Sequence, residues 1–469
     1  MAQRPAKFLE GDLMRHVVVM SLSASIGLVS IFLVDFVDLF FIAMLGQQEL
    51  AAAVGFAGTL LFFTFSVTIG MMIAISAISA QLIGRGEDAE ARRMATSAVV
   101  FGIAMSAVVA LAVWLYAREL VAWLGATGDT QTFAVNYLRI VVPSMPVATF
   151  GMMCSGLLRA HGDARRAMTV TLAAGAVNAI LDPIFIFGLG MGLEGAALAS
   201  VCARFATAIV AVIPIIRHYG GFARFDFAHF PGHLKTILAL ATPAVLTNVA
   251  TPIGNGIVTK VIAPFGDSAV AGYAVVGRLT PLAFCVIFAL SGAVGPIIGQ
   301  NFGARNYARV KGTLARAVAF ATGYTLVAWL LLMALSGFVS DQFRLTGDAR
   351  ELVFWFAVAV APLFVFNGAL FISNAAFNNL KRPIWSTLLN WGKNTIGVAP
   401  FVIFGAQIGG APGVLIGQAI GGVLFGVLGL WLAFRLVDAY DSGDTDPDGP
   451  WRPPLMRGRP DAPFSSPRA

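Results

Sequence analysis

Apolar stretches of about twenty residues or more follow one another along almost the whole chain of 469 residues. Each is long enough to cross a hydrocarbon layer of roughly 30 Å as a helix. Apolar residues make up 58% of the chain and charged residues only 12%, a balance that a water-soluble domain does not need to fill its core. The sequence therefore predicts an all-α integral membrane protein whose surface faces lipid.

The apolar stretches predict about twelve membrane-spanning helices. They are expected near residues 15–43, 52–82, 94–117, 131–158, 167–190, 193–216, 234–264, 269–298, 314–338, 351–377, 384–407 and 411–436. Basic residues cluster in alternate connecting segments, among them 85–93, 159–166 and 305–316. Because Lys and Arg are enriched in cytoplasmic loops, both termini are expected inside a bacterial cytoplasmic (inner) membrane.

The connecting segments divide the chain into two lobes of six spans. The predicted units are a cytoplasmic N-terminal segment at 1–14, a first lobe at 15–217, an inter-lobe loop at 218–233, a second lobe at 234–437 and a cytoplasmic tail at 438–469. The tail is rich in Pro, Gly and Asp and has no apolar period, so disorder is expected there.

An internal repeat relates the two lobes. The segment AQLIGRGEDAEARR, from residue 80, matches GQNFGARNYARVKG, from residue 299, which pairs Gln81 with Gln300 and Gly84 with Gly303 at an offset of 300 − 81 = 219. LGQQELAAAVG resembles FGDSAVAGYAVVG, and DPIFIFGLGMGLEGAAL resembles APFVIFGAQIGGAPGVL, in the same order and at nearly the same offset. The repeat predicts two pseudo-symmetric six-helix bundles related by an axis along the membrane normal.

Carboxylates inside the first lobe are the main candidates for coupling to an ion gradient, because an acid within a membrane span is costly and tends to mark an ion pathway. The acids are Asp35, Asp38 and Asp182. Asp38 and Asp182 are expected at similar depths, roughly 8–12 Å below the outer surface. Asn178 precedes Asp182 by one helical turn and shares its face, and Pro183 lacks a backbone donor and can leave carbonyl groups free for a cation.

Two chemistries and one structural alternative stay open for these acids. Desolvation and a neighbouring like charge can tune a carboxylate for proton exchange, while a cluster of oxygen ligands suits a hard monovalent cation. Asp35 and Asp38 are three residues apart, close enough on a helix to couple their titrations. The alternative is that the acids only bond to helix ends or to Arg204.

The second lobe carries no acid at the matching places, where Val258 stands against Asp38 and Ala399 against Asp182. Coupling is therefore expected to be asymmetric. Cationic, amide and aromatic side chains of the second lobe are instead candidates for a substrate cavity: Lys260, Arg278, Lys393, Asn378 and Trp391. Lys260 near a helix end is also explained by snorkelling toward the membrane surface.

Several other classes of function find no support in the sequence. The three cysteines, Cys154, Cys202 and Cys285, have no metal-ligand spacing. No nucleophile–base pair, metal cluster or phosphate-binding loop is visible, so no enzyme activity and no cofactor besides a coupling ion are expected. The net charge of +7 is explained by membrane topology, which leaves no reason to expect a nucleic-acid partner. We expect a monomer that acts on a small-molecule substrate in the lipid bilayer.

From about residue 10 to 437, the sequence resembles the multidrug and toxic compound extrusion (MATE) family. VDLFFIAMLG, at 37–46, is similar to the first-helix motif of the family, and the loops that contain Gln81 and Gln300 resemble its paired loops. NAILDPIFIFGLGMGLEGAALAS resembles the fifth helix and the start of the sixth.

The resemblance implies an ion site, a shape and an activity. Asn178, Asp182 and Pro183 fall where the family keeps an ion-site Asn, Asp and Pro, Ser200 stands where a hydroxyl residue completes that site, and Asp38 is its first-helix member. These residues, Pro183 aside, would hold Na⁺ if Na⁺ is the coupling ion. The implied shape is a V of two bundles, and the implied activity is the expulsion of drug-like cations as protons or sodium enter.

The missing acid in the seventh span favours the DinF-like branch of the family over the NorM-like branch. Two further functions compete with antiport. A flippase for a lipid-linked precursor would need a large cationic cavity, and a receptor or channel would show no dependence on the buried acids. Transport of lipids rather than dyes would identify the flippase, and the absence of counterflow would identify the receptor or channel.

Overall fold

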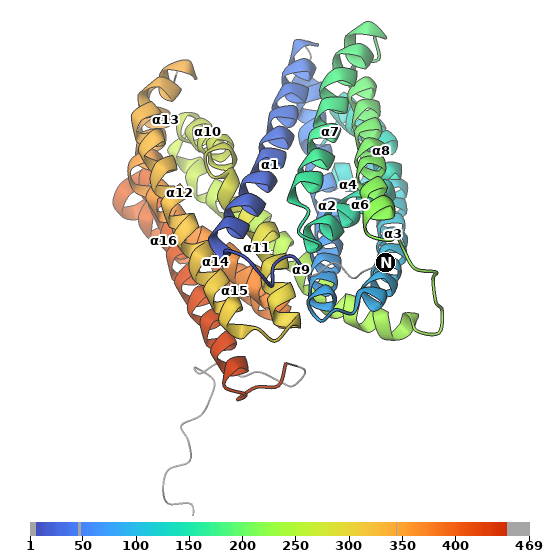
Figure 1. Ribbon diagram of the computed structural model, residues 1–469. Coiled ribbons are helices and arrows are strands. Elements are labelled where there is room, and N and C mark those ends of the chain that lie inside the picture. The colour runs from blue at the N-terminus through green and yellow to red at the C-terminus, as the bar shows by residue number, and fades with distance from the viewer. Residues whose placement is uncertain (1–5, 46–47, 344, 448–469) are drawn as a thin grey trace, which may run out of the picture.

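The structure is a computed structural model that describes residues 6–45, 48–343 and 345–447 (Figure 1). The helices of the first half are α1 (Leu13–Met44), α2 (Gln48–Gly84), α3 (Asp88–Leu115), α4 (Ala117–Trp123), α5 (Gly128–Val141), α6 (Met145–Ala160), α7 (Ala164–Pro183) and α8 (Gly192–His218). Those of the second half are α9 (Phe230–Ile262), α10 (Asp267–Ala283), α11 (Cys285–Gly303), α12 (Tyr307–Gln342), α13 (Gly347–Trp355), α14 (Phe364–Asn379), α15 (Pro383–Asn394) and α16 (Ala399–Asp441).

Short irregular turns continue several of these helices. They are η1 (Val142–Ser144) between α5 and α6, η2 (Ile184–Gly188) after α7, η3 (Ala263–Phe265) after α9, and η4 (Phe356–Val360) with η5 (Ala361–Leu363) between α13 and α14. Pro143 lies in η1 and Pro362 in η5. Because proline lacks a backbone N–H, both turns interrupt the regular helical ladder at corresponding places of the two halves.

Eleven helical segments of the described chain are long and apolar enough to cross a membrane. The last of them, Pro383–Asp441, has 59 residues and makes two crossings, since the backbone leaves helical geometry at Gly409 and Gly410. The two arms pack back to back so tightly that a Cβ on Gly405 would overlap the backbone of Gly413. The prediction of about twelve spans is therefore confirmed, with a glycine-lined hairpin between the last two.

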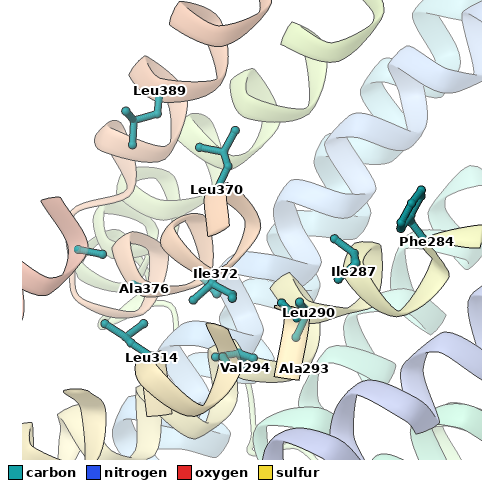
Figure 2. Close-up of a cluster of buried hydrophobic side chains, with 14 of the residues drawn as sticks. Phe284, Ile287, Leu290, Ala293, Val294, Leu314, Leu370, Ile372, Ala376 and Leu389 are labelled. Carbon is teal, nitrogen blue, oxygen red and sulfur yellow. The ribbon is translucent and has the colours of Figure 1, made fainter. Parts of the chain in front are cut away.

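The predicted eighth span, 269–298, is broken between α10 and α11 at Phe284. Phe284 is buried, and its ring stacks on that of Phe364 at a centroid distance of 4.2 Å. Figure 2 shows Phe284 at one end of a row of apolar side chains that includes Ile287 and Leu290 of α11 and Ile372 of α14. These contacts make α11 and α14 the centre of the second bundle.

The two halves form two bundles that converge at one end and diverge at the other, as in a V (Figure 1). At the narrow end, Gln81 of α2 donates from Nε2 to the carbonyl oxygen of Asn379 at 3.1 Å, and Gln300 of α11 donates from Nε2 to that of Ala160 at 2.7 Å. The two acceptors are related by 379 − 160 = 219, the offset of the sequence repeat. The two hydrogen bonds are thus one contact made twice across a pseudo-two-fold axis.

The same axis relates two glycines of the repeat. A Cβ on Gly84 would overlap the carbonyl group of Gln300, and a Cβ on Gly303 would overlap that of Gln81. We call the contact formed by these four residues the seam. Its geometry explains why both copies of the repeat carry glycine: only a residue without a side chain lets the two helix ends approach this closely.

A strap formed by residues 6–12 covers the seam. The backbone N–H of Phe8 donates to Oε1 of Gln300 at 2.9 Å, and its carbonyl oxygen accepts from Asn301 at 3.1 Å and from Arg309 at 3.0 Å. Nζ of Lys7 donates to a carbonyl group of the first half, that of residue 162, at 2.7 Å. The strap therefore ties both halves together at the narrow end, immediately before α1 begins.

The helix α16 ends at Asp441, three residues after the predicted start of the disordered tail at 438. The extension is held by an ion pair between Lys311 and Asp438 at 2.7 Å and by the hydroxyl group of Tyr440, which donates to the carbonyl oxygen of Leu380 at 2.9 Å. Most of the remaining predicted tail, residues 448–469, lies outside the described part of the chain.

Candidate functional site

Three of the predicted site residues meet between α1 and α7. With the Asn178 amide oriented so that its nitrogen faces the acids, it donates to Oδ1 and Oδ2 of Asp38 at 3.0 and 3.1 Å and to Oδ2 of Asp182 at 3.2 Å. In this orientation the amide nitrogen of Asn178 faces acceptors instead of donors. Asp38 and Asp182 also lie within hydrogen-bonding reach of each other. The amide therefore bridges two carboxylates that are close in space.

Small residues bring α1 and α7 close enough for this contact. A Cβ on Gly27 of α1 would overlap the side chain of Thr171 of α7, and a Cβ on Gly175 of α7 would lie 2.6 Å from Oγ of Ser30. Close backbone approach through small residues is the usual way in which membrane helices associate. The acid of α1 and the acid of α7 then face each other instead of lipid.

Asp182 is fully buried, and its Oδ1 has no hydrogen-bond partner in the described part of the chain. Leaving a carboxylate oxygen unpaired in the interior of a membrane protein costs roughly several kcal/mol of free energy. Either a proton or a cation at this position would relieve that cost. The site is therefore built to take up positive charge.

The chain leaves regular α-helix directly after Asp182. Pro183 ends α7, and the next five residues, Ile184–Gly188, form a π-helical turn. Gly195 of α8 packs directly on the carbonyl group of Phe185 in this turn. Irregular backbone at membrane depth is tolerated where protein covers it, and π-turns are frequent at functional sites.

Tyr137 of α5 is a further group at the site. Its hydroxyl group hydrogen-bonds to Ser200 of α8 and lies close enough to both acids to interact with their charges. The described contacts thus link Ser200 to the acids through Tyr137. Tyr137 is not among the residues predicted from the sequence, although a tyrosine within a predicted span is a signal, since its hydroxyl group needs a partner when it is buried.

Arg204 of α8 lies beside Tyr137 but is engaged elsewhere. Its guanidinium donates to the carbonyl oxygen of Val141 at 2.7 Å and to Oγ of Ser144 at 2.8 Å, and it lies over the ring of Phe65. None of these described contacts of Arg204 is a hydrogen bond to Asp38 or Asp182, so they do not support the alternative that Arg204 pairs with the acids. The side chain of Asp35, the remaining predicted acid, lies outside the described part of the structure.

The arrangement is compatible with either coupling ion. A proton on one acid could be shared with the other, since the two carboxyl groups lie within reach. A Na⁺ ion would require Asn178 to present its amide oxygen instead of its nitrogen, because the nitrogen now bridges the acids. No cluster of three or more His, Cys, Asp or Glu side chains suited to a metal is found among the described residues.

The candidates for a substrate cavity in the second lobe do not gather at one place. Lys260 and Arg278 are exposed. Lys393 of α15 is half-buried, and its Nζ donates to Oδ1 of Asn367 of α14 at 2.6 Å. Trp391 donates from Nε1 to the carbonyl oxygen of residue 246 at 3.0 Å, whereas Asn378 lies near the seam.

A ladder of buried amides continues from Lys393 along α14 and α15. Asn390 donates to Oδ1 of Asn374 at 2.9 Å, and Asn394 donates to the carbonyl oxygen of Asn390 at 2.9 Å. Gly254 of α9 packs against Asn394 so closely that a Cβ would overlap its amide. The second bundle thus has a polar interior of its own, built from amides and Lys393 of α14 and α15 rather than from acids.

Comparison with known families matches the two halves separately. A family model described as MatE matches residues 24–184 and 243–403. The second range follows the first by 243 − 24 = 219 residues at its start and by 403 − 184 = 219 at its end. This is the offset that relates the two hydrogen bonds of the seam, so the repeat is present in sequence, in family and in structure.

Full-length relatives and solved structures agree with this match. An FAD transporter of Shewanella oneidensis is 27% identical over 434 residues, covering 91% of this chain and 96% of that protein. The multidrug export protein MepA of Staphylococcus aureus is 24% identical over 399 residues, covering 83% and 86%. A crystal structure of a mutant of the MATE transporter VcmN from Vibrio cholerae is similar with a TM-score of 0.85 at 22% identity, covering 92% and 97%. A MOP superfamily transporter from Pyrococcus furiosus has a TM-score of 0.87 at 21% identity, covering 94% and 99%.

Proposed function

The chain belongs to the MatE family of membrane transporters, and we propose that it is a secondary antiporter that expels small amphiphilic or cationic organic compounds while H⁺ or Na⁺ enters. Members of this family are transporters rather than enzymes. The relatives named as a multidrug exporter and as an FAD transporter support organic molecules as the exported class. The relation to the DinF-like branch stays a prediction.

The observation that carries the proposal is the Asn178 bridge between Asp38 and Asp182. A buried carboxylate with one unpaired oxygen binds positive charge, and its burial in the first bundle keeps that charge away from lipid. In the described interior of the second bundle no two acids face each other, and Nζ of Lys393 donates instead to Oδ1 of Asn367. Coupling is therefore assigned to the first bundle alone.

The helix α1 offers a mechanical link between ion binding and the seam. It begins next to the strap at the narrow end and carries Asp38 near its other end. A helix of 32 residues spans about 48 Å at 1.5 Å per residue. A proton or cation that changes the contacts of Asp38 would shift α1 against α7, and the shift would reach the strap. The ion can drive transport only if it binds the two states of the seam with different affinity.

The charge distribution suggests how the protein is oriented. The basic clusters at 85–93, 159–166 and 305–316 belong to the narrow end, where α2, α6 and α11 end. The positive-inside rule then places the narrow end, and with it both termini, at the cytoplasm. In the state described, the protein would be closed toward the cytoplasm.

Substitution of the two acids tests the proposal. We expect Asp38→Asn and Asp182→Asn each to lower gradient-driven efflux by about tenfold or more, because an amide cannot take up the proton or cation. Efflux would be measured with the purified protein in liposomes, under a proton gradient and a sodium gradient applied separately. The gradient that drives efflux identifies the coupling ion.

The matched control is Glu194→Gln, which changes an exposed carboxylate of α8 into an amide and should leave efflux unchanged. Correct insertion of each variant would be checked by its elution as a single species in detergent. Full gradient-driven efflux in both Asp38→Asn and Asp182→Asn would refute the assignment of the coupling site.

A further inference from the structure

A small pocket lies between the two bundles next to the seam. It is lined by α2 and α6 of the first bundle and by α11 and α14 of the second, and it has a volume of about 30 Å³. Its polar lining consists of Ser76, Arg159, Ser291, Asn378 and Asn379. Arg159 and Asn379 belong to the stretches that supply the two carbonyl acceptors of the seam. The pocket therefore forms only when the two bundles are close together.

Arg159 is a cation without a strong partner. Its guanidinium makes one described hydrogen bond, to Sδ of Met72 at 2.7 Å. A thioether sulfur is a weak acceptor, whereas a guanidinium has five N–H donors. None of the ion pairs in the described part of the chain includes Arg159. A half-buried charge that lacks a counter-charge is unfavourable until an anion reaches it.

The remaining groups of the pocket are also hydrogen-bond donors. Among the described residues, Ser76 and Ser291 make no side-chain hydrogen bond, so both hydroxyl groups are available. Oδ1 of Asn378 accepts from Ser386 at 3.3 Å, which leaves its amide nitrogen for another acceptor. A guanidinium surrounded by hydroxyl and amide N–H groups is the donor set that binds carboxylates and phosphates.

We propose that this pocket, called here the Arg159 pocket, binds the anionic group of the transported compound, a carboxylate or a phosphate monoester. The proposal rests on the proposed transport function and narrows its substrate to amphiphiles that carry such a group. A volume of about 30 Å³ is close to that of one water molecule in the liquid. Only the charged oxygen atoms at the tip of the group therefore enter it, and the rest of the compound stays between the bundles.

The position of the pocket gives the substrate two affinities. Arg159 and Ser76 belong to the first bundle, whereas Ser291 and Asn378 belong to the second. Opening the narrow end separates these pairs, so the anion has its full set of donors in one state only. A ligand shifts a conformational equilibrium by the difference between its affinities for the two states. The pocket therefore couples substrate binding to the closing of the seam.

Two flavins that differ in one anionic group provide the test. Riboflavin and riboflavin 5′-phosphate would be titrated into the purified full-length protein in phosphatidylcholine nanodiscs, and binding would be followed by flavin fluorescence. Because a hydrogen bond to a charged group contributes about 1.5–3 kcal/mol, we expect the phosphate to bind about tenfold to a hundredfold more tightly than riboflavin. Arg159→Gln should reduce this preference to about twofold or less.

The matched control is Arg165→Gln, which removes an equal charge from an exposed position six residues further along and should keep the preference. A Ser76→Ala/Ser291→Ala double variant tests the same pocket without removing the arginine and should weaken phosphate binding about fivefold. If Arg159→Gln fails to fold, this double variant tests anion binding in the pocket in its place. Equal affinity of the wild type for both flavins, or an unchanged preference in Arg159→Gln, would overturn the proposal.

Two further arms separate related outcomes. Nanodiscs that contain phosphatidylglycerol show whether a lipid headgroup fills the pocket. If the lipid competes for the pocket, riboflavin 5′-phosphate binds the wild type more weakly in these nanodiscs than in phosphatidylcholine, and this difference disappears in Arg159→Gln. Such competition would support the pocket and identify the lipid as a source of the anion. Asp38→Asn and Asp182→Asn should keep the phosphate preference, because no gradient is present. If Arg159→Gln loses the preference but the wild type shows no gradient-driven efflux, the pocket is supported and antiport is rejected. If the wild type shows gradient-driven efflux but Arg159→Gln keeps the preference, only the pocket is rejected.

Discussion

The two bundles are alike where they touch and unlike inside. At the seam, Gln81 and Gln300 make the same hydrogen bond across the axis. In the interior of the first bundle, Asn178 bridges two acids, whereas the interior of the second holds Lys393 against Asn367. The duplicated fold thus keeps its contact surface in both copies but carries the pair of facing acids in the first copy alone, as far as the described residues show.

The difference has a physical origin. The seam is self-complementary, since Gly84 packs on the backbone of Gln300 and Gly303 on that of Gln81. A change in either copy disturbs both contacts. The polar groups of the two interiors lie on different helices, α1 and α7 in the first bundle and α14 and α15 in the second, so each set can change without disturbing the other. One bundle can therefore bind the coupling ion, while the seam that both bundles share continues to open and close.

Substitution at the seam should have the largest effect on this comparison. In Gly84→Val and Gly303→Val, the new Cβ overlaps a carbonyl group of the opposite bundle. Overpacking costs about 1–3 kcal/mol, which shifts the ratio of closed to open narrow ends by roughly fivefold to 150-fold. Spin labels at the exposed positions of Arg165 and Arg316 would report a longer distance between the bundles.

The control for the seam is Gly58→Val, in the same helix as Gly84. Apart from the adjoining backbone of its own helix, no atom lies within 4 Å of a Cβ at Gly58, so the label distance should not change. If the seam is symmetric, Gly84→Val and Gly303→Val lengthen the distance equally. A longer label distance in only one of the two variants would show that the two glycine contacts stabilise the closed narrow end unequally, and that the bundles are not equivalent at the seam.

The strap should show a smaller effect, confined to one side of the axis. Phe8 is 1% exposed, whereas Phe227, its counterpart at the repeat offset of 227 − 8 = 219, is 82% exposed. We expect Phe8→Ala to lower the free energy of opening the strap by about 3–5 kcal/mol, because a buried ring is lost. Hydrogen exchange at the Phe8 amide, which bonds to Gln300, would then be faster by about thirtyfold or more.

Phe227→Ala serves as the control for the strap. Substitutions at exposed positions away from special contacts stay within about 0.5 kcal/mol, so exchange at residue 8 should remain as in the wild type. Equal effects of Phe8→Ala and Phe227→Ala would mean that the segment before α9 also ties the bundles together, and the strap would no longer distinguish them.

Much of the fold follows from the sequence because apolar length and repeats are local signals. The number of spans and the pairing of Gln81 with Gln300 were predicted in this way. The sequence also singled out Asp38, Asn178 and Asp182 for one site, and the structure brings them together. Their role in coupling remains a prediction.

Other features needed the tertiary structure. Arg159 lies in a basic cluster that topology alone explains, and only the approach of the second bundle shows that it faces a pocket. Tyr137 carries no partner nearby in the sequence, since Ser200 comes from another helix. The break at Phe284 arises from packing against Phe364 across the second bundle. Each of these depends on a contact between segments that are distant along the chain.

The starts of corresponding helices provide the smallest test of the difference between the bundles. Asp163 caps α7 by accepting from the backbone N–H of Arg166 at 3.2 Å, whereas α15 begins without a side-chain cap. Burial raises the pKa of Asp163, but hydrogen bonds from Tyr219 and Arg166 outweigh it and hold the pKa below its usual value. Asp163→Asn should therefore lower the stability by about 1 kcal/mol at neutral pH, because the side chains of Arg166 and Tyr219 bind the ionised carboxylate more strongly than they would bind an amide. Because the folded pKa is depressed, this contribution is present above about pH 4 and is lost as the pH falls through the folded value. Thermal unfolding at several pH values would show the stabilities of the wild type and Asp163→Asn converging in acid. The control is Asn306→Ala, which removes the uncharged cap of α12 in the second bundle and should lower the stability by a similar amount at every pH. A difference in stability between the wild type and Asp163→Asn that does not narrow in acid would contradict the ionised cap.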